Sequence, residues 1–69
     1  MIIYVNGEER SVSDDATLID VLGAEVENGE PRRGIAVAVD GAVVPRRQLT
    51  GTELRSGTRV EIVTAVQGG

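Results

Sequence analysis

The sequence of 69 residues predicts an α+β fold, in which one mixed β-sheet packs on a single helix. Two pairs, Asn6-Gly7 and Asp40-Gly41, each follow a short apolar run, and such a pair is the strongest short signal for a β-hairpin. Between them, residues 17–22 have apolar side chains at helical spacing. Near the end, residues 58–64 alternate like a strand with one buried face.

The first element is a hairpin. Residues 1–5 are apolar and rich in β-branched side chains, so they predict a strand with at least one buried face. Asn6-Gly7 suits a type I′ turn, because both central residues of that turn need a positive φ angle. Residues 8–12 then return as the second strand, with their charged side chains outward.

A short helix follows the hairpin. Residues 13–15 are polar and break the strand pattern, so they are expected to form the turn that enters the helix. Thr17 and Asp20 have the spacing of a capping box. We expect about two turns, ending at Gly23 or extending towards Val26. Three apolar side chains at i, i+3 and i+4 form the buried stripe: Leu18, Val21 and Leu22.

The second half of the chain begins with a polar segment. Residues 27–34 contain two Gly and one Pro, so an exposed loop is expected there. Residues 35–39 and 42–44 are the two strands of the second hairpin, and Pro45 ends the later one.

The last strand completes the sheet. Before it, residues 48–56 are expected to be irregular, with one helical turn around residues 52–54, and to end in a turn at Ser56-Gly57. In the strand itself, Val60 and Ile62 face the helix, while the alternate residues face outward. This strand packs most easily beside the first strand and parallel to it. The result is the β-grasp, or ubiquitin-like, arrangement, in which a mixed sheet grips one helix.

The end of the chain is the most informative part for function. We expect one β-grasp domain over residues 1–64 and a flexible diglycine tail over residues 65–69. Gly68-Gly69 has no side chain to pack, and glycine costs more backbone entropy to order than any other residue. An extended tail without β-carbons suits a narrow channel in another enzyme, so the Gly69 carboxylate is the candidate working group. A frayed end without a function is the alternative.

Composition excludes several kinds of function. The chain has no Cys, His or Lys, so it lacks the side-chain thiol, imidazole and amine groups that serve as nucleophile, general base or metal ligand. We therefore expect no catalytic residues, no metal site and no resident cofactor. A net charge of −4 argues against nucleic acid as a partner. No apolar run approaches the ~20 residues of a membrane span, so we expect no membrane partner and a cytoplasmic location.

From end to end, the sequence resembles the sulfur carrier proteins of thiamine biosynthesis, the ThiS type. No single segment is specific, but the combination of VVPR, a VEIV strand and a terminal diglycine on so short a chain is typical of that family. The matching segments are residues 1–3, 5–8, 17–18, 21–22, 35–39, 43–46, 60–63 and 68–69.

This resemblance implies a carrier that is a substrate of its partner enzymes and is not itself an enzyme. An E1-like enzyme would adenylate the Gly69 carboxylate with ATP, so ATP belongs to the partner. Sulfide, relayed through a persulfide donor, would then replace the adenylate and give a C-terminal thiocarboxylate. Thiazole synthase would accept the sulfur. Gly68 and Gln67 belong to the tail that enters the partners.

Three further residues are predicted to form the partner interface. Val63 and Val66 flank the tail and offer apolar area, and Arg46 in the VVPR segment offers a charged hydrogen-bond donor. Arg32 and Arg33 form a second basic pair, which is either a docking patch or a solvated surface.

Four other functions remain open. The same fold and terminus suit the small subunit of molybdopterin synthase, or a sulfur carrier for cysteine synthesis or another thiometabolite. A ubiquitin-like modifier joined to target amines through Gly69 belongs to a different class. The last alternative is a β-grasp interaction module with an inert tail.

Overall fold

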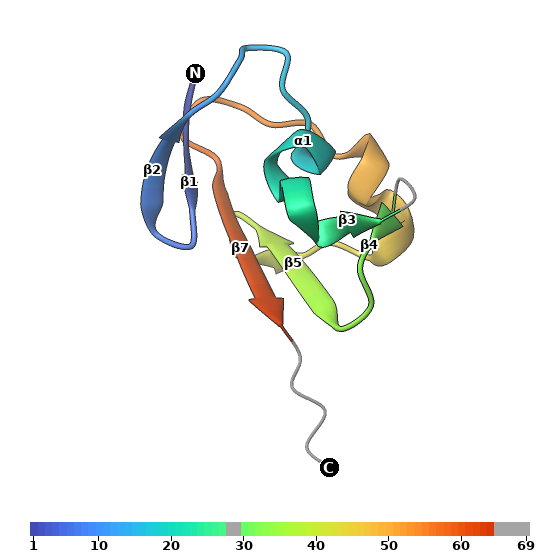
Figure 1. Ribbon diagram of the computed structural model, residues 1–69. Helices are drawn as coiled ribbons and strands as arrows, with labels where there is room; N and C mark the ends of the chain where they lie inside the picture. Colours follow the sequence, from blue (N-terminus) through green and yellow to red (C-terminus); the bar gives the residue numbers. More distant parts are fainter. Residues whose placement is uncertain (28–29, 65–69) are drawn as a thin grey trace.

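The computed structural model describes residues 1–27 and 30–64 (Figure 1). Within these ranges, a five-stranded mixed sheet has the order β2-β1-β7-β5-β6, and a separate ribbon pairs β3 with β4. The strands are β1 (Ile2–Val5), β2 (Glu8–Ser11), β3 (Val26–Glu27), β4 (Glu30–Pro31), β5 (Ile35–Val39), β6 (Ala42–Val43) and β7 (Arg59–Thr64). The helices are α1 (Leu18–Leu22) and the 3₁₀ helices η1 (Gly23–Glu25) and η2 (Arg46–Gly51). One sheet packed on one α-helix is the β-grasp arrangement that was predicted.

Strand β7 lies at the centre of the sheet. It runs parallel to β1, with Val5 opposite Val60, and antiparallel to β5, from Ile35 opposite Thr64 to Val39 opposite Val60. The parallel pairing confirms that the last strand lies beside the first. At its start, β7 therefore has a hydrogen-bonded neighbour on both edges.

Both hairpin turns have the predicted backbone. Asn6 and Gly7 have φ angles of 51° and 82°, and Asp40 and Gly41 have φ angles of 50° and 86°. These pairs of positive φ angles are those of type I′ turns, whose twist matches that of the flanking strands.

The helix begins with the predicted capping box. The Asp20 amide donates to Thr17 Oγ1 at 3.2 Å, and the Thr17 amide donates to Asp20 Oδ2 at 3.0 Å. At Gly23 the φ angle of 53° ends α1, and the chain continues to Glu25 as η1. The first N–H groups of a helix have no acceptor within the helix, and the capping box gives two of them a side-chain acceptor.

The core forms between the helix and one face of the sheet. Val60 is fully buried, as predicted, but Ile62 is only half-buried and packs at the edge of the core. The buried apolar residues are Ile3, Val5, Leu18, Val21, Leu22, Val37, Leu49 and Val60.

Two segments differ from the sequence-based expectation. Residues 27–34 are not wholly a loop, because Val26 pairs with Pro31 and Glu27 with Glu30 in the β3–β4 ribbon. Strands of two residues are too short to produce a visible alternation. The helical turn expected around residues 52–54 lies earlier, in η2, because Leu49 is the large apolar side chain in this region that becomes buried.

None of the helices in residues 1–27 and 30–64 has the length and apolar character that crossing a membrane requires.

Candidate functional site

Strand β7 leads the chain into the predicted tail (Figure 1). Thr64 ends the strand and lies opposite Ile35, the first residue of β5. The tail therefore starts at the end of the sheet where β5 begins. The predicted site residues of the tail lie outside the described residues: Val66, Gln67, Gly68 and Gly69.

An apolar patch covers part of the sheet face that points away from α1. Val63 is 57% exposed and lies opposite Ala36 on β5, while Val43 is 73% exposed and lies opposite Ala38. Directly paired residues share a face of the sheet, so these four residues form one surface, called here the apolar sheet patch. Val63 is exposed, and its role at an interface stays a prediction. Val43 was missed, although the alternation of residues 35–39 with the next strand could have placed it on this face.

The two arginine pairs come together in space. Arg46 begins η2, and its Nη1 donates to the main-chain carbonyl of Arg32 at 3.4 Å. The Arg32 amide in turn donates to the Glu25 carbonyl at 2.7 Å, which fixes this segment against η1. All four arginine side chains are exposed, and they are called here the arginine cluster: Arg32, Arg33, Arg46 and Arg47.

One end of the arginine cluster lies near the start of the tail. Only Gly34 separates Arg33 from Ile35, which is the residue opposite Thr64. The sequence has seven basic residues, and four of them are in this cluster, although the chain is acidic overall. The structure thus links the two arginine pairs and brings Arg33 near the residue where the tail starts, whereas the sequence showed two separate pairs.

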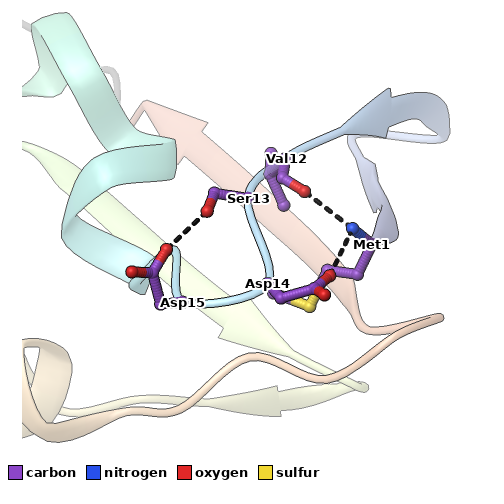
Figure 2. A network of polar contacts seen from close by, with 5 residues as sticks. All are labelled: Met1, Val12, Ser13, Asp14 and Asp15. Atoms are coloured by element: carbon purple, nitrogen blue, oxygen red, sulfur yellow. Dashed lines mark hydrogen bonds and ion pairs between the residues drawn. The ribbon is translucent and has the colours of Figure 1, made fainter.

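A polar network closes the turn that enters α1 (Figure 2). The amino group of Met1 donates to the Val12 carbonyl at 2.7 Å and to Asp14 Oδ1 at 2.9 Å. Ser13 Oγ donates to Asp15 Oδ1, and this hydrogen bond lowers the pKa of the Asp15 carboxyl. The acidic pair Asp14-Asp15 therefore orders the helix entry, as its sequence position suggested.

Comparison with known proteins supports the sequence resemblance. The model of the ThiS family matches residues 3–69. Among solved structures, the chain is similar to the thiamine biosynthesis protein (ThiS) from Geobacter metallireducens, with 25% sequence identity, a TM-score of 0.77 and full coverage of both chains. A search of the curated proteins gives no match. The family match over nearly the whole chain, together with the β-grasp sheet, shows that this chain belongs to the ThiS family.

Proposed function

We propose that this protein is the sulfur carrier of thiamine biosynthesis, with the carboxylate of Gly69 as the group that carries sulfur. The observation that carries the proposal is the family match, which extends through the diglycine to residue 69. The central position of β7 supports it, because a strand with β1 and β5 as neighbours gives the tail a firm base.

The chemistry needs a partner at each step. A carboxylate is a poor electrophile, so an oxygen of the Gly69 carboxylate attacks the α-phosphorus of ATP in an E1-like enzyme, and pyrophosphate leaves. Sulfide, which a thiol reductant releases from a persulfide donor, then attacks the carbonyl carbon, and AMP leaves with the electron pair of the broken C–O bond. The product is a thiocarboxylate, which donates its sulfur to thiazole synthase.

The chain itself supplies binding and no catalysis. It contains no Cys, His or Lys that could act as nucleophile or base. We propose that the apolar sheet patch and the arginine cluster dock the partners, since both are exposed. Val63 of the patch lies on β7, which leads into the tail, and Arg33 of the cluster lies two residues before Ile35, which is opposite Thr64. Apolar area contributes affinity, and the arginine side chains orient the complex.

The test is intact-mass analysis of the protein from cells that contain or lack the adenylating enzyme. We expect the mass increase of an oxygen-to-sulfur exchange only when that enzyme is present. A chain lacking Gly69 is the control, and it should show neither this increase nor ATP–pyrophosphate exchange. ATP–pyrophosphate exchange supported by the truncated chain would refute the proposal. Attachment of Gly69 to protein amines would instead show that the protein is a modifier.

A further inference from the structure

Two side chains complete the hydrogen-bond ladders on the two edges of β7. On the β1 edge, the main-chain amide of Asn6 donates to the Val60 carbonyl at 2.9 Å, and the side-chain oxygen Oδ1 of Asn6 accepts from the main-chain amide of Ile62 at 2.8 Å. On the β5 edge, the Asp40 amide donates to the Arg59 carbonyl at 2.8 Å, and Asp40 Oδ1 accepts from the Arg59 amide at 2.9 Å. Asn6 and Asp40 therefore make matching pairs of contacts with the same strand.

The turn geometry explains why side chains take this role. Both residues have a φ angle near 50°, where the main chain leaves the sheet. The side-chain oxygen then takes the place in the ladder that a main-chain carbonyl would fill if the strand continued. Asn and Asp combine such an oxygen with tolerance of a positive φ angle.

The two contacts differ in their distance from the tail. Asp40 binds the first residue of β7, whereas Asn6 binds Ile62, two residues before the end of the strand. The pairing of β1 with β7 stops at Val60, but the pairing of β5 with β7 continues to Thr64. Within the part of the chain that the structure describes, the Asn6 side chain is thus the last link on the β1 edge.

We propose that Asn6 is a positioning residue, which fixes the direction in which β7 delivers the tail to the adenylating enzyme. The inference rests on the proposed function and deepens it. The pairing with β5 holds only one edge of residues 62–64, and the Asn6 contact holds the other edge at Ile62. Without that contact the strand can tilt about its β5 edge, which changes the direction in which Thr64 leads into the tail. Catalysis is sensitive to misplacement of about 1 Å.

The test compares three variants in ATP–pyrophosphate exchange with the adenylating enzyme. Asn6→Gly keeps the positive φ angle but removes the acceptor, and Asn6→Asp keeps both. Asp40→Gly is the matched control, since it removes the same hydrogen bond from the same kind of turn at the far end of β7. We expect Asn6→Gly to lower kcat at saturating carrier by at least about 10-fold with an unchanged Kd, because the docking surfaces are intact. Asn6→Asp should restore kcat.

The control separates positioning from stability. Both glycine variants should lower Tm by a similar few degrees, and Asp40→Gly should keep the wild-type kcat. If both variants lost kcat equally, or if neither lost any, the inference would be overturned. A wild-type chain that is never adenylated would instead overturn the proposed function.

NMR of the free protein tests the contact between Asn6 and Ile62 without any partner. In Asn6→Gly, the Ile62 amide should exchange faster with solvent, and the residual dipolar couplings of the Val63 and Thr64 amides should change. In Asp40→Gly, those couplings should stay at their wild-type values. Unchanged couplings in Asn6→Gly would contradict the inference even if the carrier is adenylated normally.

Discussion

At the entry to α1, Ser13 Oγ donates to the Asp15 carboxyl and holds its pKa below the usual value of 3.8. A hydrogen bond to the charged form favours that form. Because the pKa is lowered on folding, Asp15 stabilises the fold above pH 3.8 and loses this contribution as the pH falls through the folded-state pKa. We predict that Ser13→Ala raises the Asp15 pKa towards 3.8, as measured by NMR titration of its carboxyl carbon. An unchanged pKa would mean that another contact holds the carboxylate.

The small size of Gly68 is expected to matter for the formation of the thiocarboxylate. A valine there adds a β-branched side chain to the tail, and it disfavours a positive φ angle. We predict that Gly68→Val leaves the Tm unchanged but strongly reduces the yield of thiocarboxylate, because the tail no longer fits a narrow activation channel. The measurement is the intact mass after incubation with the adenylating enzyme and the sulfur donor. A normal yield would show that the channel is wide at this point.

Among the elements, β7 shows most clearly how a strand directs alternate side chains into the core and onto the exposed outer face. Val60 is 1% exposed and lies in the core, whereas Val63 is 57% exposed on the opposite face. We predict that Val60→Ala costs about 2–3 kcal/mol of unfolding free energy, through lost burial and a new cavity. Val63→Ala is the matched control and should change it by less than ~0.5 kcal/mol. Urea denaturation measures both, and equal losses would mean that the faces are wrongly assigned.

The elements that the sequence predicted correctly are those with a local physical signal. The Asn6-Gly7 and Asp40-Gly41 turns need positive φ angles, and the Thr17–Asp20 pair needs only its own spacing to cap α1. The β3–β4 ribbon had no such signal, since each strand has two residues. The position of η2 depended on where Leu49 reaches the core, which is set by packing and not by local sequence.

At the scale of the whole molecule, the candidate site combines segments that are far apart in the sequence. Arg32 and Arg46 are 14 residues apart, and their contact depends on the placement of η2, which the sequence did not predict. Val63 could be placed on the outer face from alternation alone, whereas placing Val43 on the same face also needed the register between β5 and β6. Strand alternation therefore predicted part of the apolar sheet patch, and only the fold assembled the arginine cluster.

The proposed function requires two partners that both bind this small protein and both receive the same tail. They are therefore expected to use overlapping surfaces near the exit of β7, and to exclude one another. We predict that thiazole synthase, titrated into a complex of the carrier with the adenylating enzyme, displaces that enzyme. Arg46→Ala should weaken at least one complex and reduce its dependence on salt, because an arginine in the cluster attracts an acidic partner surface.

Arg55→Ala is the control for this prediction, since Arg55 is exposed and precedes the start of β7, at the opposite end of that strand from the tail. It removes the same charge and should leave both affinities unchanged. Equal weakening by the two variants would mean that the partners respond to net charge and not to the arginine cluster. A stable ternary complex would show that the partners bind separate faces and share only the tail.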